Sequence, residues 1–318
     1  HQDFEANTLR TFRCMYQGMQ EVRRLSRETG VEFDENPTGI LYLFRTRETF
    51  ARRSNDWDLL MDHGLDLRRV TVDECVDIEP GLSASRASIG GGFFSPEESA
   101  GDTFVFTRNL SEFCDRRGVK FLYQTTIHAL EQSKGRLSAV ITDRGRLEAD
   151  GYVMALGPEA PKLGRTIGLK LPIFPVKGYT VSIPSGKSYS PPRVGVIEED
   201  NLVAFASLGN RFRFSTGAEF AGYDRGFSEQ NFRRLMSVAQ GLFPSAGDYS
   251  QASYWACLRP VTAAGPPILG ACPVDNLFLN LGHGAAGWTQ ACATSKAVAE
   301  IVSGQQPSLD MEGLTYCD

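Results

Sequence analysis

The sequence of 318 residues is poor in the side chains that most often bind metals, with 7 cysteines and 4 histidines. The cysteines stand at irregular positions, without a CxxC pair or a cluster with histidine: Cys14, Cys75, Cys114, Cys257, Cys272, Cys292 and Cys317. An odd number at such spacing argues against a disulfide framework and against a zinc site, so we expect no metal. The same usage is typical of a reducing cytoplasm.

Excess positive charge and long apolar runs are also missing. The formal net charge is -5, whereas binding to nucleic acid or to an anionic membrane favours a basic surface. No apolar run reaches the roughly 18–20 residues of a membrane span, and the polar start HQDFEANTLRTF is unlike a signal peptide. These absences predict a cytoplasmic protein and leave open a peripheral contact with the inner membrane or with a quinone.

What the sequence does have is the composition of a globular protein, with 42% hydrophobic and 22% charged residues. At roughly 100–200 residues per domain, its length predicts two domains. No repeat, low-complexity tract or flexible linker separates them, so we expect them to be interleaved. The first residue is histidine rather than methionine, which indicates that the chain was cleaved or that its start is not the start of the gene.

The spacing of apolar residues predicts a mixed α/β arrangement. Residues 9–29 repeat apolar side chains every three or four positions, as an amphipathic helix does. A capped helix over residues 102–118 is followed by a predicted strand at 119–123. Between residues 173 and 216, short β-rich stretches separated by Pro and Gly predict a largely antiparallel sheet, and residues 227–242 predict another helix.

A glycine-rich loop near the C-terminus is the sharpest local motif. The sequence GHGAAG at 282–287 follows a predicted strand at 277–281 and precedes a predicted helix at 288–303. A dinucleotide fingerprint needs a further strand and an acidic residue about 20 positions on. Because the chain runs out about one helix later, we reject that interpretation. Small residues and a helix N-terminus instead suit an anionic or electron-accepting group, the alternative being a tight turn.

Arg259 is the one charged residue in the apolar stretch YWACLRP at 254–260. A buried guanidinium must be paired, because its desolvation is costly. Its planar fork suits a substrate carboxylate, bound through two parallel hydrogen bonds. The alternative is a structural ion pair with a protein carboxylate, which the residues alone favour.

Five segments occur in the order found in one enzyme family. They are VKFLYQTTIHAL (119–130), YVMALGP (152–158), PVKGYTVSIP (175–184), YWACLRPVTAAGPPILG (254–270) and LGHGAAGWTQAC (281–292). On these segments the sequence resembles the small subunit of bacterial FAD-dependent D-amino-acid dehydrogenases, in the superfamily of glycine oxidase, sarcosine oxidase and D-amino-acid oxidase. The similarity covers nearly all of residues 9–315.

The resemblance implies roles for individual residues. Arg259 matches the arginine that clamps the substrate carboxylate. The backbone of Ile127 matches the strand position that reads adenine, and Ala155 and Gly157 match the stretch beside the cofactor's diphosphate. The loop that reaches the pyrimidine side of the flavin is matched by Gly282, His283, Gly284, Ala286, Gly287, Trp288 and Thr289.

Two further residues have alternative interpretations. Arg213 falls on a strand that passes near the flavin in relatives, so it is a candidate substrate-binding residue; a structural salt bridge is the alternative. Cys257 stands where sarcosine oxidases hold the cysteine that bonds covalently to the flavin. A free, buried cysteine behaving as a small hydrophobe is the alternative there. No residue is assigned as a catalytic acid or base.

The implied fold is α/β (α+β), with an incomplete FAD-binding, Rossmann-like domain interleaved with an antiparallel-sheet substrate domain. We expect an opening helix at 1–30, a substrate-binding domain at 31–100 and 172–254, and the remainder of the FAD-binding domain at 101–171 and 255–318. The family's opening strand, GxGxxG loop and helix do not precede Leu9. A missing N-terminal segment or a companion chain is therefore the expected partner; the alternatives are a fragment and a protein that has given up catalysis.

The implied reaction is FAD-dependent oxidative deamination of a D-amino acid, with hydride transfer to flavin N5 giving a 2-oxo acid and ammonia. Arg259 would hold the substrate so that its Cα–H points at N5, and such orientation lowers the barrier. The alternatives are oxidation of imino or N-methyl amino acids, as in D-hydroxyproline dehydrogenase and sarcosine or glycine oxidase, and a non-catalytic subunit.

Overall fold

The computed structural model describes residues 2–316. The helices are α1 (Gln2–Thr29), α2 (Arg47–Asp62), α3 (Val72–Ile78), α4 (Thr103–Asp115), α5 (Ala160–Gly164), α6 (Arg233–Leu242) and α7 (Gly287–Val302). The strands are β1 (Ile40–Phe44), β2 (Arg68–Val70), β3 (Gly91–Ser95), β4 (Ile127–Ser133), β5 (Arg136–Thr142), β6 (Gly145–Leu147), β7 (Tyr152–Met154), β8 (Ile173–Pro184), β9 (Gly195–Glu198), β10 (Val203–Leu208), β11 (Arg211–Glu219), β12 (Ser253–Thr262), β13 (Ile268–Ala271) and β14 (Leu277–Leu281). The predicted α/β class is confirmed.

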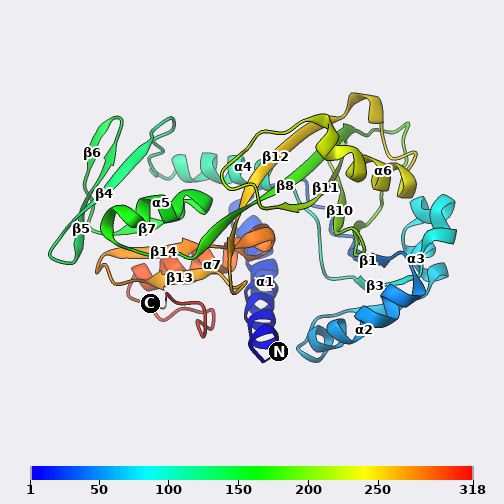
Figure 1. Ribbon diagram of the computed structural model, residues 1–318, viewed down its shortest axis with the longest axis horizontal. Helices are drawn as coiled ribbons and strands as arrows, with labels where there is room; N and C mark the ends of the chain where they lie inside the picture. The colour runs from blue at the N-terminus through cyan, green and yellow to red at the C-terminus, as the bar shows by residue number, and fades with distance from the viewer. Residues whose placement is uncertain (1, 317–318) are drawn as a thin grey trace.

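A large sheet of eight strands forms one half of the molecule, with the order β12-β8-β11-β10-β9-β1-β3-β2 (Figure 1). Neighbours run antiparallel except β1 and β9, which are parallel. The sheet joins strands from residues 40–95 with strands from 173–262, and β12 continues past the expected boundary at residue 254. A core of buried aromatic and aliphatic side chains, among them Phe205, Phe212 and Phe243, packs between this sheet and α6.

Two smaller sheets form the other half. One has the order β13-β14-β7, with β14 parallel to β7, and the other is the meander β4-β5-β6. Within residues 2–316, the second edge of β7 pairs with no strand. The side chain of Val153 on this strand is 49% exposed, which leaves both the backbone edge and an apolar side chain open.

The long helix α1 stands between the two halves and packs along α7 (Figure 1). The predicted helix at 9–29 is confirmed and begins earlier, and Gly30 ends it in the left-handed conformation, with φ of 72°. Buried Cys14 on α1 contacts a cluster that includes Ala297 and Val298 of α7. This contact fixes where the helix α7 begins relative to α1.

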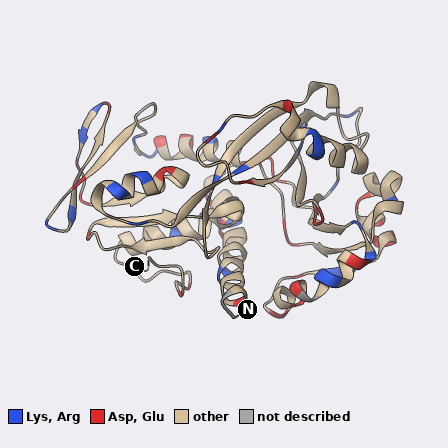
Figure 2. Cartoon of the chain, in the orientation of Figure 1, with Lys and Arg blue, Asp and Glu red and all other residues tan. Residues whose placement is uncertain are grey.

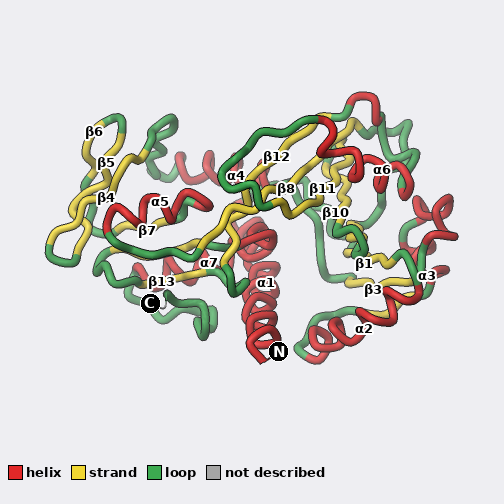
Figure 3. Tube along the Cα trace, viewed as in Figure 1, coloured by secondary structure: helices red, strands yellow, loops and turns green. Residues whose placement is uncertain are grey.

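One predicted strand is wrong. Residues 119–123 run as a loop between α4 and β4 (Figure 3). Their apolar side chains are exposed, from 37% for Phe121 to 66% for Tyr123. The pattern is typical of a strand, but a strand needs a neighbour for its backbone hydrogen bonds, and the described chain offers none at this place. The predicted helix at 227–242 is also divided, into a 3-10 turn, η4 (Glu229–Phe232), followed by α6.

Charged side chains of both signs are interspersed over both halves (Figure 2). This distribution agrees with the small net charge of -5. Some of these charges form local ion pairs, such as Arg24 with Glu28 within α1.

Candidate active site

Two loops meet at one edge of the sheet that contains β14 and β7. These strands are parallel, so their carboxyl ends lie at the same edge, where open α/β sheets bind ligands. Gly282 follows β14 there, and Ala155 follows β7. The next turns, η6 (Gly284–Ala286) and η2 (Gly157–Glu159), both contact β12, the strand of Arg259. The fold thus brings three separate predicted segments together.

The backbone conformation of the glycine-rich loop favours glycine at two positions. Gly282 and Gly284 have φ of 79° and 57°, in the left-handed region that favours glycine. A Cβ at Gly282 would also collide with the methyl group of Thr262 on β12. A larger residue there would push the loop away from β12.

Helix α7 begins without a side-chain cap. Ala286 is its N-cap, and no side chain accepts a hydrogen bond from the first N–H groups. These groups, with the positive end of the helix dipole, favour a negative charge or an electron-rich oxygen nearby.

His283 is held neutral in the loop. Its Nε2 lies 3.0 Å from Oγ1 of Thr294 on α7. Burial lowers the pKa of the imidazole to about 4, because a charged ring would lose its hydration. At neutral pH the loop therefore presents the helix dipole but no histidine charge.

The side chains of the next two residues hold the loop in place. The ring of Trp288 packs edge-on against Phe33 and Phe106, with centroids 5.6 and 5.0 Å away. The backbone carbonyl of Thr289 lies against Gly18 of α1, where a Cβ would collide with it. Packing with α1 and with this aromatic cluster positions the start of α7.

Arg259 projects from β12 over Gly178 of β8, at a position where a Cβ would collide with the guanidinium. Its Nη1 donates a hydrogen bond to the carbonyl oxygen of Gly217. Among residues 2–316 no carboxylate lies within ion-pair distance of it, and burial lowers its pKa. The guanidinium nevertheless stays charged, so a half-buried cation retains N–H donors that no carboxylate of the described residues engages.

Cys257 lies two residues before Arg259 on the same strand and is a half-buried free thiol. Burial raises the pKa of this thiol, against the opposing charges of Arg259 and Arg225. The protonated thiol is the weaker nucleophile. The environment is therefore that of a small apolar side chain.

Arg213 takes part in a charged cluster on β11. Its Nη2 lies 3.4 Å from the carboxylate of Asp102, and its Nε donates to Ser182 Oγ at 3.2 Å. Asp102 is completely buried, caps α4 and also pairs with Arg211 at 2.8 Å. Desolvation opposes its ionisation, but Arg213, the backbone amides of α4 and Arg211 outweigh desolvation and lower the pKa of Asp102. This geometry is that of a structural salt bridge.

The three remaining predicted residues, Ile127, Ala155 and Gly157, lie on other elements than β12. Ile127 begins β4, pairs with Thr142 and packs on the core of the smaller half. Ala155 is exposed beyond the end of β7. Gly157 has φ of 55° and open space where its Cβ would stand. The turn η2, which begins with Gly157, contacts β12.

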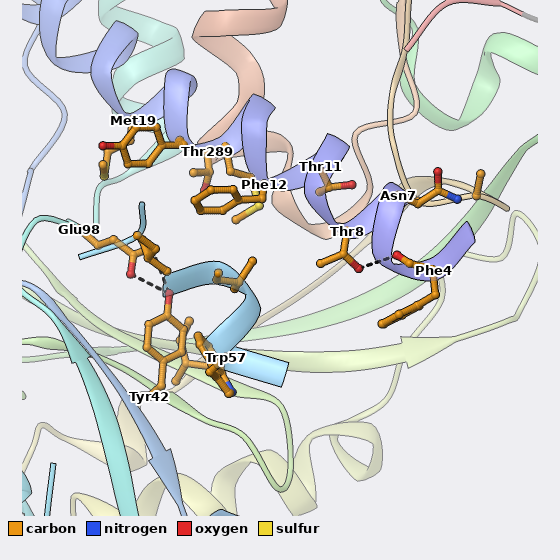
Figure 4. A pocket seen from close by; sticks show the side chains of 17 residues that line it. Phe4, Asn7, Thr8, Thr11, Phe12, Met19, Tyr42, Trp57, Glu98 and Thr289 are labelled. Atoms are coloured by element: carbon orange, nitrogen blue, oxygen red, sulfur yellow. Dashed lines mark hydrogen bonds between the residues drawn. The ribbon is translucent and has the colours of Figure 1, made fainter. Parts of the chain in front are cut away.

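An apolar cavity of about 470 Å³ lies between α1, α2 and β1 and reaches Thr289 (Figure 4). Its walls are formed by Phe12, Met15, Met19, Tyr42, Trp57 and Leu60. Ala264 and Gly265, just beyond β12, and Glu98 also line it, as do the polar side chains of Asn7, Thr8 and Thr11 on α1. The sequence did not predict this cavity, because its lining comes from elements far apart in the chain.

In residues 2–316, no three His, Cys, Asp or Glu side chains gather as metal ligands. No helix in this range combines the length and apolarity that a membrane span requires.

The fold and the two loops define a class of protein. The family model described as FAD dependent oxidoreductase matches residues 1–301, and the chain belongs to this family. It is 39% identical to D-amino acid dehydrogenase 2 of Mesorhizobium japonicum over 296 residues, which are 93% of this chain and 71% of that protein. It is 37% identical to D-amino acid dehydrogenase of Paramagnetospirillum magneticum, over 98% of this chain and 74% of that protein.

Solved structures share the fold. Glycine oxidase from Geobacillus kaustophilus superposes with a TM-score of 0.85 at 23% identity, covering 95% of this chain and 81% of the other. L-proline dehydrogenase from P. horikoshii superposes with a TM-score of 0.83 at 20% identity, covering 95% and 81%. These likenesses confirm the α/β architecture with its large, mostly antiparallel sheet.

Proposed function

We propose that this chain forms the substrate-binding part, and a portion of the cofactor-binding part, of an FAD-dependent D-amino-acid dehydrogenase. The reaction would convert a D-amino acid to a 2-oxo acid and ammonia. The relatives named D-amino acid dehydrogenase support the substrate class through 37–39% identity over more than nine tenths of the chain.

The observation that carries the proposal is the state of Arg259. A half-buried guanidinium without a carboxylate partner in the described chain is costly unless a ligand completes it. An amino-acid carboxylate fits its planar fork with two hydrogen bonds. Holding that carboxylate would fix the orientation of the substrate Cα–H, and no catalytic base is needed if the amine binds in its neutral form.

The residues at the start of α7 fit the electron-rich edge of a flavin. Backbone N–H groups without a side-chain cap, a neutral His283 and glycines at 282 and 284 leave room and hydrogen-bond donors for it. Bound FAD would supply the acceptor for the hydride lost from the substrate. Ala155, Gly157 and Ile127 remain proposed contacts for the diphosphate and adenine parts, and Cys257 a proposed neighbour of the ring.

The proposed FAD site also requires a second polypeptide segment. The chain spans 71% and 74% of the two relatives, and a strand, GxGxxG loop and helix would supply the missing phosphate contacts. We propose that such a segment, in the same gene product or in a companion chain, completes the FAD site.

The test uses the chain co-expressed with the part of the Mesorhizobium japonicum relative that it does not span. We expect flavin absorption that bleaches when a D-amino acid is added. Arg259→Lys should raise KM for the D-amino acid roughly 10- to 100-fold, since a lost charge-assisted hydrogen bond costs about 1.5–3 kcal/mol. Gly178→Ala should act in the same direction by displacing the guanidinium, whereas Gly241→Ala, on the exposed face of α6, should leave KM unchanged.

Each contrary result would favour a different alternative. Flavin that binds but is bleached by sarcosine or D-proline and not by other D-amino acids would favour imino- or N-methyl-amino-acid oxidation. A protein that stays colourless with the added segment would favour a non-catalytic subunit. An unchanged KM in Arg259→Lys would overturn the role given to this residue.

A further inference from the structure

The apolar cavity beside α1 contains one carboxylate, that of Glu98, whose side-chain hydrogen bonds within the described residues are to the hydroxyl groups of Tyr42 and Ser95 and not to a cation. The Tyr42 hydroxyl lies 2.8 and 3.0 Å from the two carboxylate oxygens of Glu98 (Figure 4). In residues 2–316 no Lys, Arg or His lies within ion-pair distance of Glu98. The nearby acid Glu199, in contrast, faces Arg53 at 3.6 Å.

The surroundings make an unpaired carboxylate costly. Ring centroids of Tyr42 and Trp57 are 4.4 Å apart, and Met19 and Phe12 face them from α1 (Figure 4). Burial raises the pKa of the Glu98 carboxyl, although its hydrogen bonds with Tyr42 and Ser95 act in the opposite direction. A cation arriving from outside would provide the missing charge, as desolvated acids in apolar sites bind best to charged donors.

We propose that Glu98 binds the ammonium group of a primary amine whose apolar side chain fills the cavity between α1, α2 and β1. A volume of about 470 Å³ is within the range of small-molecule sites. The aromatic rings also suit a cation, because their faces are electron-rich. The mostly apolar lining selects an apolar or aromatic side chain over a charged one.

This site deepens the proposed function and rests on it for the identity of the amine as substrate. The cavity reaches Thr289 at the start of α7 and Gly265 just beyond β12, so it adjoins the segments that would hold the flavin and the substrate carboxylate. Glu98 would bind the entering substrate as its ammonium form, which would lose one proton to water and so give the neutral amine that the proposed hydride transfer requires. The apolar walls would then set the preference for D-amino acids with large apolar side chains.

The experiment measures binding of phenethylamine and of 2-phenylethanol to the full chain by calorimetry, without flavin and without turnover. We expect the amine to bind about tenfold or more tightly than the alcohol. Glu98→Gln keeps an acceptor for Tyr42 but removes the charge, and it should reduce amine binding to the level of the alcohol. Glu97→Gln removes the same charge at an exposed neighbouring position and should change neither affinity.

Binding of 2-phenylethanol by Glu98→Gln at the wild-type affinity shows that the variant is folded. Equal binding of amine and alcohol by the wild type, no binding of either, or an unchanged amine affinity in Glu98→Gln would overturn the proposal. If amine binding depends on Glu98 but no D-amino acid is oxidised, the proposed function fails and the amine site stands. If D-amino acids are oxidised without any effect of Glu98→Gln, only the amine site fails.

Discussion

At the residue scale, the candidate site contains two groups whose charge is governed by burial. Arg259 stays charged and lacks a carboxylate partner in the described chain, whereas His283 is driven to its neutral form. The difference follows from their intrinsic pKa values, since desolvation can neutralise imidazole within the physiological range but not guanidinium. The first residue is thus suited to binding an anion and the second to forming a neutral, packed loop.

His283 should make the protein sensitive to mild acid. Its folded-state pKa of about 4 lies below the unfolded value of about 6.5, so protonation favours the unfolded chain. The stability that depends on neutral His283 is present above pH 6.5 and is lost as the pH falls towards 4, on the order of 3 kcal/mol in total. Urea unfolding at pH 7 and pH 4.5 should show a smaller pH-dependent loss for His283→Asn than for wild type.

The matched control is His63→Asn, which changes an exposed histidine at the C-cap of α2. It should follow the wild-type pH dependence. Equal acid sensitivity of wild type and His283→Asn would show that His283 is not buried as neutral imidazole.

At the element scale, the contact between α1 and α7 positions the start of α7. Gly18 is buried on α1, and a Cβ there would collide with the Thr289 carbonyl, which is backbone and cannot rotate away. The small residue therefore permits an approach of the two helices that no other amino acid allows.

Gly18→Ala should destabilise the protein by about 1–3 kcal/mol, as overpacking typically does, despite the higher helix propensity of alanine. Chemical unfolding measures this directly. Gly241→Ala, at an exposed helical position with open space around it, should be neutral or stabilising by up to about 1 kcal/mol. A stabilised Gly18→Ala would show that α1 and α7 are not in close contact.

At the scale of the whole molecule, the smaller half has an open side. The free edge of β7 and the exposed loop 119–123 both present apolar side chains and, within the described residues, backbone without strand partners. Open strand edges template pairing with further strands. These two features are the places where the proposed companion segment would add to the fold.

Hydrogen exchange should report that addition. Amides of Val153 and of residues 120–123 should exchange rapidly in the chain alone, because no ladder protects them, whereas the Val119 N–H donates to the Cys114 carbonyl. Co-expression with the unspanned part of the Mesorhizobium japonicum relative should slow both by at least about tenfold, while the exchange of β8, in the centre of its own ladder, stays slow in either sample. Fast exchange at both places in a flavin-containing complex would show that the segment docks elsewhere.

The sequence by itself determined the elements whose periodicity and capping are local. The helix at 9–29, the strand at 277–281 and the helix after it follow from apolar spacing and from the glycines that end or begin them. Arg259 could be singled out as well, because a lone charge in an apolar strand needs a partner. The motif around it was sufficient to indicate the family.

Only the tertiary structure determined which groups those residues contact. In the tertiary structure Arg213 pairs with Asp102, whereas Arg259 has no carboxylate partner in the described chain. Both arginines nevertheless lie on strands of similar composition. The tertiary structure turned 119–123 into a loop, because strand formation depends on a neighbour that local pattern does not specify. It also assembled the Glu98 cavity from α1, α2 and β1, since packing joins elements that are distant along the chain and carry no shared local signal.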